Sequence, residues 1–173
     1  MRVDYKRIAI VGSGGSGKST LARQLAAITG LPLIHLDLKF WLPNWKQVPK
    51  EEWAAKMEVL TQGESWIMDG DYGGTMEMRF VAADLVIFLD INRFVCLYRV
   101  IKRRNKKRTD FPNFLEEKLD WDFFKFLIWI WNFPKRNRNT IIRLHEKYPD
   151  KPFVTIKNKR ELKQILEEFC ETK

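Results

Sequence analysis

The sequence feature that most constrains the fold is a glycine-rich segment close to the N-terminus. It runs Gly12-Ser13-Gly14-Gly15-Ser16-Gly17-Lys18-Ser19 and matches the pattern G-x-x-x-x-G-K-[ST]. Residues 7–11 before it, apolar from Ile8 on, predict a buried strand, and the spacing of Leu21, Leu25 and Ile28 after it predicts a helix. A strand, a glycine loop and a helix in this order form the context in which the pattern binds phosphates.

This loop predicts a site for a nucleoside triphosphate. Its glycines let backbone N–H groups point at a phosphate chain, and the helix N-terminus adds partial positive charge. Lys18 is expected to reach the β- and γ-phosphates, and the Ser19 hydroxyl to bind Mg²⁺. The alternative is a glycine-rich turn without a ligand. The predicted ATP-binding residues are Gly12, Ser13, Gly14, Gly15, Ser16, Gly17, Lys18, Ser19 and Thr20.

Three aspartates end predicted strands and are candidates for the metal shell: Asp37, Asp69 and Asp90. Asp69 is favoured as the metal ligand because a flexible turn, residues 70–74, follows it. Asp37 is expected to contact the substrate, its phosphoryl acceptor or a metal-bound water. Asp90 precedes a predicted helix and has a structural role available as its cap. The alternative is that all three only end strands in open turns.

Strand and helix patterns alternate along the rest of the chain. Further strands are predicted at 32–36, 66–68, 85–89 and 152–156, and helices near 50–62, 94–101, 113–134 and 162–169. This alternation predicts an α/β fold with a five-stranded parallel sheet and right-handed crossovers. No linker-like stretch divides the 173 residues, so a single domain over 1–173 is expected.

The charge balance points to a polyanionic partner. The chain has 31 Lys+Arg and 22 Asp+Glu, a formal net charge of +9, with a basic run at 99–108. The longest apolar run, 126–131, is far shorter than the ~20 residues of a membrane span. Two cysteines are too few for a disulfide framework, and the N-terminus lacks a secretory pattern. A cytoplasmic protein without a membrane partner is expected.

Several segments together resemble a known group of proteins. They are residues 12–20, 35–37, 43–45, 69–72, 79–84 and 99–103. The chain resembles the adenylate-kinase-like P-loop proteins of the DNA topology modulation and flagellar-regulation group, within the nucleoside monophosphate kinase superfamily. The resemblance implies a three-layer P-loop kinase fold with strand order 2-3-1-4-5. It also implies a substrate-side insertion at about 40–63 and a lid at about 103–113.

The resemblance also implies roles for basic residues. Arg99 and Arg103 are four residues apart, share one helix face, and are expected to act with Lys18 and Asp69 on the transferring phosphoryl group. Better-known nucleoside monophosphate kinases carry an acceptor-gripping arginine where this chain has Gly73. Arg79 is expected to replace it, which leaves the acceptor open. Two further arginines are expected to reach the phosphates from the other side: Arg136 and Arg138.

The tryptophans allow two interpretations each. Trp45, in the expected insertion, would stack on a base or belong to a small apolar core. Trp121, Trp129 and Trp131 lie on a helix with more than one apolar face, which is either buried or an oligomer contact.

Two hypotheses for function follow. The first is an enzyme that transfers the γ-phosphoryl group of ATP, with Mg²⁺, to a small acceptor such as a nucleotide or nucleoside. The acceptor would bind near Asp37, Trp45, Asp69 and Arg79. The second is an ATP-dependent regulatory protein that binds nucleic acid, suggested by the net charge and the basic run, although no recognition motif is visible.

Overall fold

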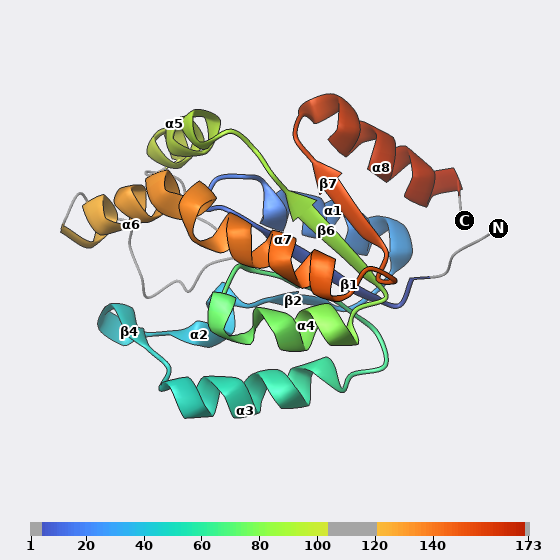
Figure 1. The fold of residues 1–173 in the computed structure, drawn as a ribbon, viewed down its shortest axis with the longest axis horizontal. Coiled ribbons are helices and arrows are strands. Elements are labelled where there is room, and N and C mark those ends of the chain that lie inside the picture. The colour runs from blue at the N-terminus through green and yellow to red at the C-terminus, as the bar shows by residue number, and fades with distance from the viewer. Residues whose placement is uncertain (1–4, 104–120, 172–173) are drawn as a thin grey trace.

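The computed structural model describes residues 5–103 and 121–171 (Figure 1). Its centre is a five-stranded sheet in the order β2-β5-β1-β6-β7, in which every neighbouring pair is parallel. Numbered among themselves along the chain, these strands have the predicted order 2-3-1-4-5, which is thereby confirmed. Their bounds are β1 (Arg7–Gly12), β2 (Leu33–His35), β5 (Trp66–Asp69), β6 (Leu85–Leu89) and β7 (Phe153–Ile156).

Helices cover both faces of the sheet, which gives the predicted three layers (Figure 1). On one face Ile8 and Ile10 pack with α1 (Lys18–Thr29) and α8 (Lys159–Glu171). Ala9 and Val11 alternate with them along β1, as side chains of a strand do, and pack on the other face. The helices of that face are α3 (Lys50–Thr61), α4 (Met76–Ala82) and α7 (Asn137–Lys147).

Two more helices stand beyond the carboxyl ends of the strands. α5 (Arg93–Arg103) and α6 (Trp121–Asn132) pack against each other around Cys96, Val100, Phe123 and Ile130. The 3₁₀ turn η3 (Phe133–Lys135) contains Pro134 and follows α6, where the sequence predicts a break. Residues 113–120 of the helix predicted at 113–134 lie outside the described residues.

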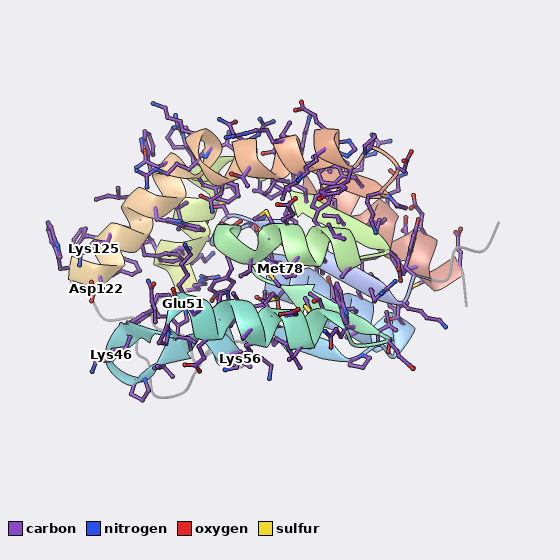
Figure 2. All side chains as sticks on the ribbon, turned by 60° about the horizontal axis from the view of Figure 1, so that its bottom comes forward. Lys46, Glu51, Lys56, Met78, Asp122 and Lys125 are labelled. Atoms are coloured by element: carbon purple, nitrogen blue, oxygen red, sulfur yellow. The ribbon has the colours of Figure 1, made fainter. Side chains whose placement is uncertain are left out.

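The stretch between β2 and β5 holds the elements where an insertion is expected. It comprises α2 (Asp37–Phe40), β3 (Trp41–Leu42), the turn η1 (Pro43–Trp45), β4 (Lys46–Gln47) and α3, and β3 and β4 form a small antiparallel pair. Figure 2 shows Lys46, Glu51 and Lys56 along this side of the molecule. Except for Arg103, the lid expected at about 103–113 lies outside the described residues.

The register of the central strands positions the functional residues. Ile10 pairs with Asp69 across β1 and β5, and Gly12 pairs with Leu89 across β1 and β6. Because the strands are parallel, the glycine loop, the turn after Asp69 and Asp90 all leave the sheet at one edge. No helix in the described part of the chain is long and apolar enough to cross a membrane.

Candidate functional site

The loop from Gly12 to Gly17 forms a tight cradle between β1 and α1. Gly12, Gly15 and Gly17 have φ of 143°, 76° and 106°, a region that side-chain-bearing residues avoid. A Cβ on Gly12 would lie 2.7 Å from the carbonyl oxygen of Leu89, and one on Gly15 would collide with the carbonyl oxygen of Cys96. Both glycines are therefore required by the close approach of backbone to backbone.

Two hydroxyl groups of this loop are buried without a hydrogen-bond partner among the described residues. Ser13 and Ser16 are 3% and 1% exposed, and their hydroxyls have no hydrogen-bond partner among the described residues. No described side chain caps the first turn of α1, so its N–H groups are also available. Buried polar groups are normally hydrogen-bonded. The cradle, its hydroxyls and the open helix start fit the phosphate chain of ATP.

Two predicted basic residues lie on or beside the loop. The Lys18 Nζ donates a hydrogen bond to the Ser13 carbonyl oxygen at 2.9 Å. The Arg99 guanidinium reaches the loop from α5 and donates to the carbonyl oxygen of Ser16 at 3.0 Å and, more weakly, to that of Gly15 at 3.4 Å. Arg103, one turn further along α5, is close enough for its charge to act on Lys18.

The Lys18 ammonium is the electrostatic centre of the site. Burial lowers its pKa from the usual value, and the Arg103 charge adds to this lowering. The carboxylates of Asp71, Asp37 and Asp69 act in the opposite direction. Three acidic side chains from two strand ends therefore gather near one lysine.

Asp69 and Asp37 are each held by a neighbouring side chain. The Asp69 Oδ1 lies 2.5 Å from the His35 Nδ1, across the register pair that joins β5 and β2. The Asp37 Oδ1 accepts a hydrogen bond of 2.5 Å from the Tyr72 hydroxyl. Burial and the Asp37 charge raise the pKa of that hydroxyl, so Tyr72 stays a donor. These bonds fix both carboxylates at the same edge of the sheet.

Asp71 is a functional candidate that the sequence analysis did not select. It is 7% exposed, its Oδ2 accepts a hydrogen bond from the Asn137 amide, and its Oδ1 has no partner among the described residues. Burial raises its pKa to about 6, although Lys18 and Arg79 pull the value down. A carboxyl group with this pKa exists largely as a base at neutral pH.

The expectation that Arg79 contacts an acceptor is not supported by its surroundings. The residue is 0% exposed, and its guanidinium donates to the carbonyl oxygens of Gly70 at 2.8 Å and Asp71 at 2.5 Å. Tyr72 in the same turn has a φ of 36°, which is unfavourable for a residue with a side chain. Arg79 therefore stabilises the turn that carries Asp71 and Tyr72.

Arg138 and Asp90 pair with each other. The Arg138 Nε lies 3.1 Å from both Asp90 carboxylate oxygens, and its Nη2 lies 3.0 Å from one of them. This pairing differs from the expectation that Arg138 reaches phosphates, and it leaves Asp90 the least suited of the three metal candidates. Arg136 is exposed just before α7. The described residues contain no group of three or more His, Cys, Asp or Glu side chains placed to hold a metal ion.

Trp45 belongs to an aromatic cluster on the insertion side. Its ring lies 5.5 Å from that of Trp41, which in turn is 5.1 Å from the ring of Phe40. Phe40 also contacts Trp53 and Tyr72, so the cluster reaches the turn after β5. This arrangement matches the small apolar core considered for these tryptophans, while a base-stacking role for Trp45 stays a prediction.

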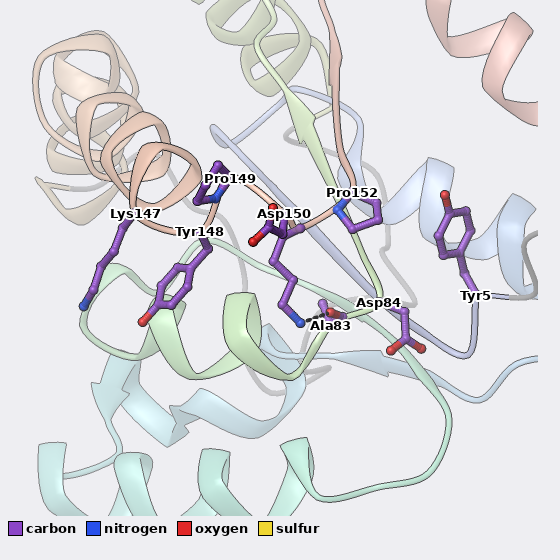
Figure 3. Close-up of a pocket in the computed structure, with 9 residues that line it drawn as sticks. Tyr5, Ala83, Asp84, Lys147, Tyr148, Pro149, Asp150 and Pro152 are labelled. Carbon is purple, nitrogen blue, oxygen red and sulfur yellow. Dashed lines mark hydrogen bonds between the residues drawn. The ribbon is translucent and has the colours of Figure 1, made fainter.

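A separate hollow lies at the opposite edge of the sheet. It has a volume of about 580 Å³ and is lined by residues that precede β1, β6 and β7, including Asp84 and Asp150 (Figure 3). The Lys151 Nζ donates a hydrogen bond to the Ala83 carbonyl oxygen there. None of the loop residues or the three clustered aspartates borders this hollow.

Comparison with known proteins identifies the fold. The shikimate kinase of Bacteroides thetaiotaomicron is 19% identical, covers 96% of this chain and 97% of its own, and has a TM-score of 0.56. The shikimate kinase of Aquifex aeolicus is 15% identical, with 96% and 94% covered and a TM-score of 0.52. A deoxyadenosine kinase of M. mycoides with the products dCMP and dCDP is 18% identical, with 96% and 100% covered and a TM-score of 0.50.

No protein-family sequence profile and no curated protein sequence matches the chain. At 15–19% identity the solved structures show a shared fold, the P-loop kinase fold that the sequence predicts. Membership of the DNA topology modulation group stays a prediction.

Proposed function

We propose that the protein is an ATP-dependent phosphotransferase that moves the γ-phosphoryl group to a small acceptor such as a nucleotide or nucleoside. The observation that carries the proposal is the glycine cradle with Lys18 at its end, facing the carboxylates of Asp37, Asp69 and Asp71. A phosphate-binding loop opposite a set of proton acceptors is the arrangement that phosphoryl transfer to a hydroxyl needs.

The donor side consists of the loop and the two arginines of α5. Backbone N–H groups of residues 12–20 would hold the phosphate chain of ATP, with Lys18 at its β- and γ-phosphates. Arg99 and Arg103 would stabilise the negative charge of the transferring group, since positioned guanidinium groups are worth ~10³-fold or more in rate. The buried hydroxyls of Ser13 and Ser16 support this assignment because a phosphate oxygen would satisfy them.

We assign Ser19 and Asp69 to hold Mg²⁺. Mg²⁺ prefers hydroxyl, carboxylate and water oxygens and needs only one or two protein ligands beside substrate phosphates. When bound, it supplies positive charge that neutralises phosphate oxygens. Asp69 is favoured over Asp90 because both oxygens of Asp90 accept hydrogen bonds from Arg138.

The acceptor side consists of Asp37, Asp71 and the neighbouring aromatic cluster with Trp45. In the proposed step Asp71 accepts the proton of the acceptor hydroxyl, whose oxygen forms a bond to the γ-phosphorus. The bond between that phosphorus and the β–γ bridging oxygen breaks, and its electron pair leaves on ADP. The pKa of about 6 suits this role because Asp71 is ionised at neutral pH yet still binds a proton during transfer.

The test is acceptor-dependent formation of ADP from ATP and Mg²⁺, measured over a panel of nucleosides, nucleotides and small polyols. We expect at least one acceptor to raise the rate well above slow hydrolysis and the Lys18→Ala variant to lose that rise. Thermal unfolding of the variant would show that it still folds. ATP binding without any acceptor-dependent ADP would contradict the proposal.

The nucleic-acid hypothesis draws less support from the described residues. Arg99 donates to the glycine loop and the charge of Arg103 acts on Lys18, while residues 104–108 of the basic run lie outside the described part. Two of the seven basic residues of this run are therefore explained by phosphates of a small substrate. Strongly salt-dependent binding of the protein to duplex DNA would revive the hypothesis.

A further inference from the structure

The acceptor side of the site is richer in negative than in positive side chains. Asp37, Asp69 and Asp71 all act on the Lys18 ammonium, whose place at the end of the loop assigns it to the phosphates of ATP. Arg99 and Arg103 approach from α5, beside the same loop. The positive charge of the described site therefore lies on the donor side.

The two arginines that the sequence predicts at the acceptor or its phosphates, Arg79 and Arg138, bind other groups of the protein. The Arg79 guanidinium is fully buried and bonded to backbone carbonyl oxygens, so an acceptor phosphate has no access to it. Arg138 is held by both oxygens of Asp90. Other cations on this side are exposed, among them Lys39 and Lys46 of the insertion and Arg136, and the experiment below tests Arg136 because it precedes Asn137, which contacts Asp71.

The hydrogen-bonding capacity of the Asp37 and Asp71 carboxylates limits the kind of ligand group that they can bind. An ionised carboxylate accepts hydrogen bonds and cannot donate them, so its partner must be a hydroxyl, an amine or an amide N–H. Asp71 is 93% buried, and its Oδ1 still lacks a partner in the described structure, which makes it the oxygen that requires a donor from a ligand. A phosphate dianion beside these carboxylates would instead add repulsion between like charges.

We propose that the acceptor is a hydroxyl compound that carries no phosphate group, a nucleoside-like alcohol rather than a nucleotide, and that Asp71 binds its reactive hydroxyl. The inference rests on the proposed function and narrows the class of substrate. Of the nucleotide and nucleoside acceptors that the sequence leaves open, it selects the nucleoside-like class.

The first experiment compares matched pairs. Each pair is an alcohol and its own phosphate monoester, for example each nucleoside and its 5′-monophosphate, assayed with ATP and Mg²⁺ by chromatography of the products. We expect kcat/KM for the preferred alcohol to exceed that for its monoester at least ~100-fold, the scale of discrimination that an unpaired buried charge produces. Arg136→Ala should keep this preference.

The outcomes separate the two claims. Equal or better use of the monoesters would overturn the inference while leaving the phosphotransferase proposal standing. Use of the monoesters that is lost in Arg136→Ala would show that this arginine binds a phosphate of the acceptor, and would also overturn it. Failure of both members of every pair would contradict the proposed function itself.

The second experiment tests Asp71 directly. Asp71→Asn keeps the size of the side chain but removes the charge and the proton acceptor, so we expect kcat with the preferred alcohol to fall ~10²–10⁴-fold. Binding of a fluorescent ATP analogue should change less than threefold. The matched control is Asp150→Asn, an exposed aspartate at the opposite edge of the sheet (Figure 3), which should behave as wild type. A loss of ATP binding equal to the loss of turnover would show that Asp71 supports only the loop, against the inference.

Discussion

Asp71 is an acid whose ionisation opposes folding and, in the proposed reaction, provides the proton acceptor. Its carboxyl group is buried, and its ordinary pKa of 3.8 is raised to about 6 by loss of water. A pKa shift of this size means that ionising Asp71 costs roughly 3 kcal/mol more in the folded chain than in the unfolded chain. Costly charged groups of this kind gather at functional sites.

Activity should therefore depend on pH through this residue. Between pH 5 and 7.5, kcat/KM for the best acceptor is expected to rise and to level off above an apparent pKa near 6, because only ionised Asp71 takes the proton. The residual activity of Asp71→Asn should lack that rising limb. A rising limb in the variant with the same midpoint would assign it to another group.

The free energy of unfolding of Asp71→Asn is the control for this prediction. The stability of the wild type should fall over the pH range in which its activity rises. Because the folded-state pKa is raised, the unfolded chain binds fewer protons than the folded chain between about pH 4 and 6, so wild-type stability falls as pH rises through this window. Asp71→Asn should be more stable than wild type at pH 7.5. The gain should shrink toward pH 4, as followed by urea unfolding.

The buried guanidinium of Arg79 donates hydrogen bonds to backbone carbonyl oxygens. Arg79→Met removes the donors to the Gly70 and Asp71 carbonyl oxygens and leaves them buried without partners. We expect the free energy of unfolding to fall by about 3 kcal/mol or more. Arg79→Lys should also be destabilised, because an ammonium cannot reproduce the planar fork. The control Arg143→Lys, on the exposed side of α7, should change stability by less than ~0.5 kcal/mol.

At the scale of elements, α5 holds the glycine loop from outside the sheet. The Cys96 carbonyl oxygen lies where a Cβ of Gly15 would be, and Arg99 donates to the loop three residues further on. The loop conformation therefore depends on a helix that begins nearly eighty residues later in the chain.

Two glycines with the same φ test this contact. Gly15 has a φ of 76° and packs against α5, whereas Gly30 has a φ of 77° and has nothing within 4 Å of its virtual Cβ. Gly30→Ala should cost only the left-handed backbone penalty of ~1–2 kcal/mol and leave ATP affinity unchanged. Gly15→Ala should lose more stability and weaken ATP binding at least tenfold, measured by calorimetry. Equal effects of the two changes would show that α5 does not constrain the loop.

The success of the sequence predictions also varies by element. The central strands were predictable because both of their faces are buried and their residues are almost all apolar. The helices α4 and α7 and the pair β3–β4 were not predicted. In α7, which has 11 residues, only Ile141 and Leu144 are buried, while α4 has 7 residues and β3 and β4 have 2 each. Short elements carry too few periodic positions to stand out.

The candidate site likewise has parts that the sequence predicted and parts that it did not. The glycine loop is local, so the spacing of a few neighbouring residues was enough to predict it. The environment of Asp71 depends on Asn137, which is 66 residues away, and the role of Arg79 depends on a turn folded back onto it. His35 contacts Asp69 on the neighbouring strand, 34 residues further along the chain. Such long-range pairs leave no local pattern.

At the scale of the whole molecule, one surface remains unusually apolar. Phe94, Tyr98 and Ile101 recur at helical spacing on the outside of α5, and four side chains do so on α6. The two rows adjoin, because the rings of Phe94 and Trp131 lie 5.5 Å apart. The residues on α6 are Trp121, Phe124, Ile128 and Trp131, all more than 40% exposed.

We predict that a second copy of the chain covers this surface. The seven side chains of the two rows, each with ~200 Å² of surface and about half exposed, present roughly 700 Å² of apolar surface to solvent. This area is close to the ~800 Å² that each partner buries in a standard interface. Sedimentation velocity should detect a dimer, and Ile128→Glu should shift it to monomer. Val59→Glu, at an even more exposed position on α3, should not change the dimer. A monomeric wild type at 100 µM would contradict the prediction.

The start of α7 has a consequence for how the two substrates meet. Asn137 and Arg138 are adjacent, yet one contacts Asp71 after β5 and the other contacts Asp90 after β6. A single rigid turn thus spans two strand ends on either side of the glycine loop. In the proposed reaction this turn would fix the distance between the glycine loop and the Asp71 carboxylate before ATP or the acceptor binds.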